Sequence, residues 1–87
     1  MKENIQVLIY SSSLCGYCYQ AKTLLKKKNI SFQEIDVDED FNKRKEMIAK
    51  SNGRTSVPQI FFGDIHIGGC DDLINLDRIG KLEVEDE

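Results

Sequence analysis

The segment SSSLCGYC, residues 11–18, places two cysteines three positions apart directly after the apolar run IQVLIY at residues 5–10. The apolar run is short and rich in β-branched residues, which predicts a strand covered on both faces. From residue 17 to residue 28, small and apolar residues recur on one stripe, which predicts a helix. We therefore expect Cys15 just before a helix and Cys18 inside its first turn.

The rest of the chain continues this strand and helix into an α/β order of elements. The sequence predicts a stop at Asn29, a strand over residues 31–37, a helix over 41–50 with N-caps among residues 38–40, short strands over 59–62 and 65–67 joined by a hairpin, and a helix over 70–80. A right-handed crossover through the first helix would set the first two strands parallel. We expect a single domain over residues 1–80 and an acidic, frayed tail over 81–87.

Composition excludes several classes of function. No apolar run approaches the roughly 20 residues that a membrane helix needs, so no association with a membrane is expected. The formal net charge of −3 argues against a general affinity for nucleic acid. The first residues do not resemble a secretory signal, so we expect a cytoplasmic protein. Three cysteines in such a chain do not make a disulfide framework, and CxxC is better interpreted as a reactive or metal-binding pair.

The position of the two cysteines predicts different roles for them. Unpaired N–H groups and the helix dipole stabilise an anion at a helix start, where the free cysteine pKa of about 8.5 can fall to roughly 3.5–7.5. We expect Cys15 to be the thiolate that attacks a disulfide. Cys18 lies on the apolar face within reach of Cys15 and would act as the resolving thiol. Gly16 permits a tight entry into the helix, and Tyr17 would project beside the exposed sulfur.

Three segments together carry a family resemblance. CGYC at 15–18, TSVP at 55–58 before a strand, and GGCDDL at 68–73 opening the last helix resemble the active-site segments of glutaredoxins, and the small dithiol glutaredoxins of bacteria most closely. The resemblance covers nearly the whole chain except the tail. It implies a thioredoxin-like fold with a four-stranded mixed sheet and three helices. It also implies glutathione as co-substrate, glutathionylated or disulfide-containing proteins as partners, and a monomer.

The same resemblance implies a glutathione site made of Tyr17, Arg54, Ser56, Val57, Pro58, Gly69, Cys70 and Asp71. A cis peptide at Pro58 would turn the N–H and C=O of Val57 outward to pair with an extended peptide, whereas a trans proline would simply open a strand. The N–H groups of Cys70 and Asp71 would face a carboxylate. The Asp71 carboxylate could hold the ligand's ammonium; the alternative is that Asp71 or Asp72 simply caps the helix. Arg54 either meets the glycyl carboxylate of glutathione or is an ordinary loop residue.

Two positions depart from the commonest glutaredoxin pattern. Many members carry proline where Gly16 stands and lysine at or near Ser12. The missing lysine removes one partner for a glutathione carboxylate and one charge that would help Cys15 to ionise. CGYC also occurs in glutaredoxins that hold a [2Fe-2S] cluster between two protomers, each giving its first cysteine and a bound glutathione. A cluster-carrying dimer with Cys15 as the iron ligand is therefore an alternative function.

A zinc-binding module is the third hypothesis. Cys15, Cys18, His66 and Cys70 could in principle form a Cys3His site. A CxxC between a strand and a helix lacks the glycine knuckles of a zinc turn, which disfavours this hypothesis. The alternation around His66 predicts that its ring faces water rather than a site. Cys70 is expected to be a small buried apolar residue, with glutathionylation as the alternative.

Overall fold

The computed structural model describes residues 6–82. Its strands are β1 Val7–Ser11, β2 Gln33–Asp36, β3 Gln59–Phe62 and β4 Ile65–Gly68, and its helices are α1 Gly16–Lys27, α2 Phe41–Lys50 and α3 Cys70–Arg78. This order confirms the predicted alternation of elements. The expected strand start at Ile5 lies outside the described residues. Within residues 6–82, no helix combines the length and the apolar character needed to cross a bilayer.

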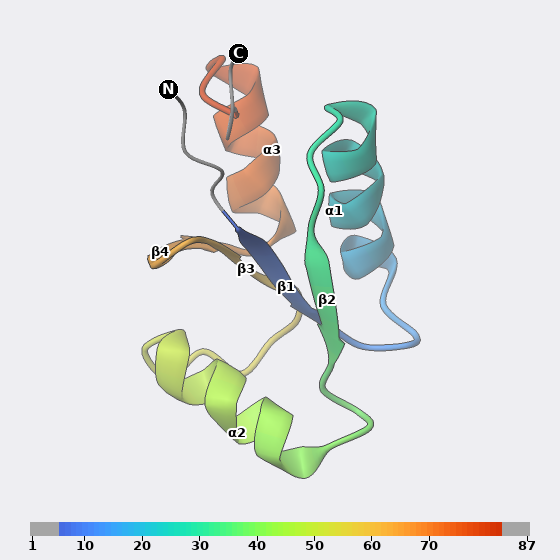
Figure 1. Ribbon diagram of the computed structural model, residues 1–87, viewed down its shortest axis with the longest axis vertical. Coiled ribbons are helices and arrows are strands. Elements are labelled where there is room, and N and C mark those ends of the chain that lie inside the picture. Colours follow the sequence, from blue (N-terminus) through green and yellow to red (C-terminus); the bar gives the residue numbers. More distant parts are fainter. Residues whose placement is uncertain (1–5, 83–87) are drawn as a thin grey trace.

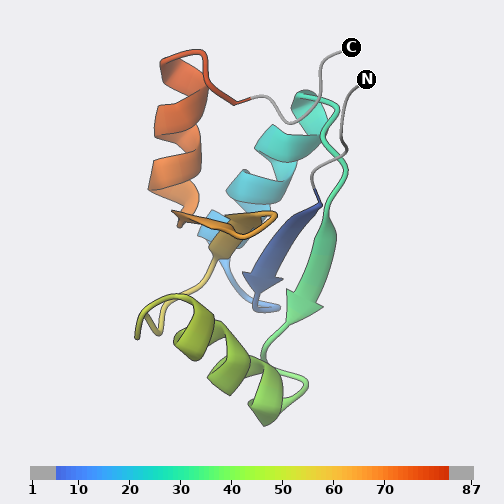
Figure 2. The same cartoon turned by 60° about the vertical axis from the view of Figure 1, so that its left-hand side comes forward.

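The four strands form one mixed sheet with the order β2-β1-β3-β4. β1 is parallel to β2, as the crossover through α1 predicts, and antiparallel to β3. Figure 1 shows α1 and α3 on one side of the sheet and α2 on the other, and the turned view in Figure 2 shows the same layers. The predicted thioredoxin-like architecture of four strands and three helices is confirmed, and β1 occupies an interior position in the sheet.

The sheet divides the hydrophobic core into two clusters. Val7 and Ile9 of β1 pack with α1 and α3, whereas Tyr10 packs with Met47 of α2. This alternation follows from the period of two along a strand, and it explains why the run IQVLIY is apolar at nearly every position. Phe32 and Ile35 obey the same geometry, because they contact opposite clusters. Their odd spacing therefore points the two side chains to opposite faces of this edge strand, which is otherwise exposed at Gln33 and Glu34.

The helix ends follow local sequence signals. Asp40 caps α2 by accepting a hydrogen bond from the N–H of Asn42 at 2.9 Å. Asn29 has a φ of 61° just after α1, and Gly80 has a φ of 76° just after α3, so both adopt the left-handed conformation that ends a helix. The packed core extends past residue 80, because Leu82 is buried in the α1 and α3 cluster. The remainder of the expected tail lies outside the described residues.

Candidate active site

The two cysteines of CGYC lie at the start of α1, where the turn after β1 delivers them. Cys15 is the N-cap residue in extended conformation, and its Sγ accepts a hydrogen bond from the N–H of Cys18 at 3.0 Å. The structure pairs the two sulfurs as a disulfide, with Cα atoms 5.2 Å apart. The Cys18 side chain is 1% exposed, whereas Cys15 is partly exposed. A substrate sulfur can therefore reach Cys15 but not Cys18.

The environment of Cys15 favours an anion once the disulfide is reduced. The Cys18 N–H points at its sulfur, and the positive end of the α1 dipole adds to this field. The first turn of α1 contains no acidic side chain that would oppose a negative charge. The arrangement is that of an activated thiol with a second thiol behind it, which is the requirement for exchange between thiols and disulfides.

A second loop meets Cys15 from the other side. The peptide bond between Val57 and Pro58 is cis, as the resemblance implied, and the Pro58 side chain is buried. The carbonyl oxygen of Val57 lies 3.9 Å from the Cys15 sulfur. The TSVP segment is thus placed directly beside the reactive cysteine, although it is far away in the sequence.

A pocket of about 440 Å³ adjoins this meeting point. It is lined by Tyr17, Arg54, Ser56, Val57, Pro58, Gly69, Cys70, Asp71 and Asp72. The structure therefore brings together all the residues that the sequence assigns to a glutathione site. They come from three segments of the chain: the first turn of α1, the loop before β3, and the start of α3. Asp72 is the additional member.

Asp72 is a residue of the pocket that sequence reasoning left as a simple capping candidate. Its Oδ2 accepts a hydrogen bond from the Gly69 N–H at 2.9 Å and lies 3.9 Å from Nη1 of Arg54. Gly69 is the N-cap residue of α3, and Asp72 at position N3, rather than Asp71, makes the capping contact with it. The three-residue spacing of a capping box could have indicated this. Gly68 has a φ of 121°, and a Cβ there would collide with the Asp72 carboxylate. The Gly-Gly pair thus leaves room for this cap.

The serine run before Cys15 forms contacts that the sequence did not reveal. The Ser12 hydroxyl donates to Asp38, and the Ser13 N–H lies 3.4 Å from Oδ2 of the same carboxylate. The Ser12 hydrogen bond, with smaller contributions from Ser13 and Arg44, holds the pKa of Asp38 below its usual range. Arg44 of α2 lies 3.4 Å from Asp38 and also 3.4 Å from the carbonyl oxygen of Thr55. Asp38 and Arg44 therefore link the two loops that meet at Cys15.

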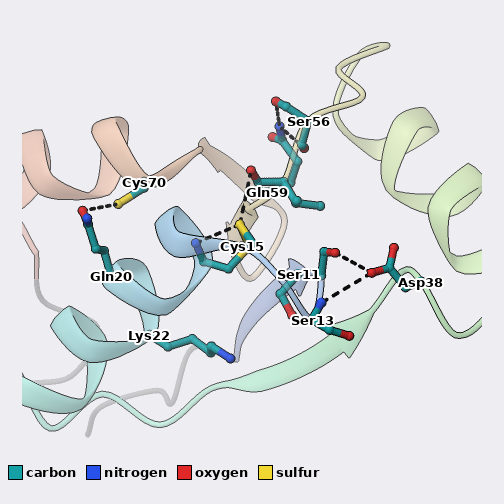
Figure 3. The surroundings of a disulfide bond; sticks show 12 residues. Ser11, Ser13, Cys15, Gln20, Lys22, Asp38, Ser56, Gln59 and Cys70 are labelled. Carbon is teal, nitrogen blue, oxygen red and sulfur yellow. Dashed lines mark hydrogen bonds between the residues drawn. A yellow bond between two sulfur atoms is a disulfide. The ribbon is translucent and has the colours of Figure 1, made fainter.

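The remaining candidates do not join the cysteine pair in a metal site. Cys70 is 4% exposed, and its sulfur lies 3.9 Å from Oε1 of Gln20 on α1. Figure 3 shows these two side chains pointing toward one another. Burial, with a smaller effect from the Asp71 charge, raises the pKa of the Cys70 thiol. Within residues 6–82, no three His, Cys, Asp or Glu side chains converge as a metal would require, so the Cys3His site is not formed. His66 was expected to face water rather than a site. It lies outside the pocket, but its ring is only partly exposed, because it stacks on Phe61.

Comparisons with known proteins agree with this geometry. A protein-family model described as Glutaredoxin matches residues 7–67. Glutaredoxin 3 of Escherichia coli strain K12 is 54% identical over 77 residues, which cover 88% of this chain and 92% of that protein. The solution structure of glutaredoxin from Brucella melitensis has a TM-score of 0.80 at 46% identity, and the match covers 91% of this chain and 85% of that one. The crystal structure of a buckwheat glutaredoxin-glutathione complex has a TM-score of 0.81 at 31% identity, covering 90% of this chain and 73% of that one.

Proposed function

The chain belongs to the glutaredoxin family, and on that basis we propose that it reduces glutathione mixed disulfides and protein disulfides with glutathione as the electron donor. Family membership implies a thiol-disulfide oxidoreductase in general. The observation that carries the finer proposal is the partly exposed Cys15, whose sulfur lies against Val57 at the edge of the pocket. We place the reaction in a reducing cytoplasm, where thiols of this kind stay available.

The proposed glutathione pose uses main-chain groups and two charged side chains. The extended tripeptide pairs with the backbone of Val57, which fixes its sulfur next to Cys15. The N–H groups of Cys70 and Asp71, at the start of α3, receive the γ-glutamyl carboxylate, because a helix N-terminus favours an anion. Asp71, which is exposed in the pocket, accepts from the ligand's ammonium. Arg54 pairs with the glycyl carboxylate.

The proposed reaction with a glutathionylated protein has two exchange steps. The Cys15 thiolate attacks the glutathione sulfur, a bond forms between Cys15 and glutathione, and the protein leaves as a thiolate that takes a proton from solvent. A second glutathione, as thiolate, then attacks the bound glutathione sulfur. This step releases the Cys15 thiolate and oxidised glutathione. Two glutathione sulfurs have been joined in one disulfide, and the protein thiol has been regenerated.

Protein disulfides use the second cysteine. The Cys15 thiolate forms a mixed disulfide with one substrate sulfur, and the other substrate sulfur leaves as a thiol. Cys18 then attacks the Cys15 sulfur, which frees the reduced substrate and forms the Cys15–Cys18 disulfide that the structure contains. Two glutathione molecules reduce this disulfide and leave as oxidised glutathione. The burial of Cys18 suits this intramolecular role.

A steady-state assay tests the proposal directly. The protein is given a glutathionylated cysteine peptide, glutathione, and a coupled reaction that consumes oxidised glutathione, and the Cys15→Ser variant is the control. We expect turnover that saturates with the peptide and disappears in the variant. Equal rates with a disulfide of the same peptide that lacks glutathione would contradict the glutathione specificity.

A glutathione-ligated [2Fe-2S] dimer is the second candidate function. It is favoured by the exposed surface around Cys15, where Leu14 is 98% and Tyr17 63% exposed, because a second protomer could cover these apolar side chains. A Cβ at Gly16 would meet no atom within 4 Å, so the turn beside Cys15 is uncrowded. Anaerobic reconstitution with iron, sulfide and glutathione should give a coloured dimer that Gly16→Pro weakens. A monomer without iron under these conditions would remove this function.

A further inference from the structure

A chain of polar contacts runs beneath the pocket from β4 to the loop before β3. The His66 ring stacks on Phe61 with centroids 4.8 Å apart, and its Nε2 lies 2.6 Å from Oε1 of Gln59. The Gln59 amide nitrogen in turn donates to the carbonyl oxygen of Ser56 at 3.0 Å, and it lies 3.4 Å from the Ser56 hydroxyl. Figure 3 shows Gln59 and Ser56 facing one another. Gln59 is 0% exposed, so water cannot replace these partners.

The direction of each hydrogen bond follows from its neighbours. If the Gln59 carboxamide were turned over, its oxygen would face the Ser56 carbonyl oxygen, and two acceptors would meet with no proton between them. The amide nitrogen must therefore point to Ser56 and the amide oxygen to His66. His66 must then carry its proton on Nε2 and donate it.

The His66 ring is held in its neutral form by its surroundings. Burial first, and the charge of Arg54 second, lower the pKa of His66, while the charge of Asp72 raises it to a smaller extent. A proton on Nε2 matches the Gln59 oxygen, and the lowered pKa favours the neutral ring that carries it there.

The last member of this chain belongs to the pocket. Ser56 lines it and directly precedes Val57, whose carbonyl oxygen lies 3.9 Å from the Cys15 sulfur. Neither His66 nor Gln59 lines the pocket. We propose that His66 and Gln59 are positioning residues, which fix the Ser56 and Val57 backbone in the orientation that recognises the glutathione part of a substrate. This inference rests on the proposed function for its ligand, but its structural half concerns the free protein.

The test separates recognition of glutathione from reactivity of Cys15. His66→Phe keeps the aromatic stack on Phe61 but cannot donate, so the buried Gln59 oxygen loses its partner. We expect kcat/KM for a glutathionylated peptide to fall about threefold to tenfold, as for the loss of one buried hydrogen bond. The rate of iodoacetamide labelling of Cys15 should not change. His66→Gln supplies an N–H of similar reach and should restore most of the loss.

A measurement without glutathione checks the structural half. In the free protein, the carbonyl-carbon NMR resonance of Ser56 should move in His66→Phe and in Gln59→Met, and return towards its original place in His66→Gln. Ile67→Val is the matched control, because it also removes packing from β4 but contacts the opposite cluster. It should leave the Ser56 resonance and kcat/KM unchanged.

The outcomes distinguish the two proposals. If the wild type prefers glutathionylated peptide but His66→Phe shows the same kcat/KM and the same Ser56 resonance, the positioning role is overturned. If His66→Phe slows peptide reduction and iodoacetamide labelling equally, the effect is on Cys15 or on stability, and the role is again overturned. A wild type without any preference for glutathionylated peptide overturns the proposed function instead. In that case a Ser56 resonance that differs between the wild type and His66→Phe would still support the positioning of the backbone. An unchanged resonance would overturn the positioning role as well.

Discussion

The sulfur of Cys15 lies 3.9 Å from the carbonyl oxygen of Val57 and 3.0 Å from the backbone nitrogen of Cys18. The two contacts have opposite effects on a thiolate, because a carbonyl oxygen repels negative charge and an N–H attracts it. The N–H contact is shorter and is reinforced by the α1 dipole, so the net field favours the anion. The Val57 carbonyl oxygen is then free to accept a hydrogen bond from a ligand that lies between the loop before α1 and the loop before β3.

Serine substitutions of the two cysteines should have unequal effects. Cys15→Ser should abolish all disulfide exchange, because a hydroxyl does not ionise near neutral pH. Cys18→Ser should still reduce glutathionylated peptide, since glutathione can attack the Cys15 mixed disulfide, but should lose the reduction of protein disulfides. The labelling of each variant with iodoacetamide between pH 4 and pH 9 gives the second readout.

Rapid labelling well below pH 8 is expected for Cys18→Ser and not for Cys15→Ser. Cys70 remains in both variants, and Cys15→Ser also keeps Cys18. Both of these side chains are buried, so they should label slowly. If both variants lost activity to the same extent and labelled alike, the assignment of distinct roles would be wrong.

Gly68→Ala should damage the pocket. Its φ of 121° is unfavourable for alanine, and the added Cβ would collide with the Asp72 carboxylate that caps α3. We expect a loss of about 2–4 kcal/mol in the free energy of unfolding, measured by urea titration, together with reduced turnover of glutathionylated peptide. Gly80→Ala is the control, since its φ is 76° but a Cβ there meets nothing within 4 Å. Equal losses in both variants would show that the Asp72 contact contributes nothing.

Tyr10→Phe should destabilise the α2 side of the sheet. Tyr10 is 0% exposed, and its hydroxyl donates to Oε2 of Glu46 at 2.5 Å. Without this donor we expect about 1–2 kcal/mol less free energy of unfolding, the range for a hydrogen bond to a charged group that can be partly hydrated again. Tyr19→Phe is the matched control, because Tyr19 is 70% exposed and its change should be within about 0.5 kcal/mol. Unfolding curves that coincide for both variants would contradict the expectation.

His66 should make stability depend on pH. Burial lowers the pKa of His66 in the folded state below the ordinary value of 6.5, so the unfolded chain binds the proton more readily. The stabilising contribution is therefore complete above pH 6.5 and is lost as the pH falls through the lower, folded-state pKa. His66→Phe should remove this component, which makes the drop in the urea midpoint between pH 7.5 and pH 5 smaller than in the wild type. A drop of the same size in both proteins would exclude His66 as its source.

The sequence predicted those elements whose local residue pattern matches the pattern of burial in the structure. The apolar run of β1, the small and apolar stripe of α1 and the stops at Asn29 and Gly80 each carry their own signal, and the structure confirms them. The strand around Phe32 and Ile35 could not be assigned a register, because these two apolar side chains point to opposite faces of the sheet while Gln33 and Glu34 between them are exposed. Leu82 was assigned to a tail because acidic neighbours hide its apolar side chain in the sequence.

The pocket was predictable only as three separate motifs, and the structure supplies what joins them. The links from Ser12 and Ser13 to Asp38 bridge residues 26 and 25 positions apart, and nothing local marks Asp38 as their partner. The partial burial of the His66 ring was not predicted for a related reason. Alternation along β4 places its ring on one face of the sheet, but it cannot show that Phe61 and Gln59 already occupy that face.

Apart from its bond to the Cys18 sulfur, the Cys15 sulfur has its polar contacts with the nitrogen of Cys18 and the carbonyl oxygen of Val57, which both belong to peptide groups. A point mutation replaces a side chain and leaves the peptide groups in place, so a substitution at Cys18 or Val57 does not directly remove these backbone contacts. It can act on them only through the residues that hold the backbone, such as glycines, caps and buried amides. Over evolutionary time, descendants of this sequence can therefore change the exposed side chains around the pocket while the peptide groups at the sulfur stay the same.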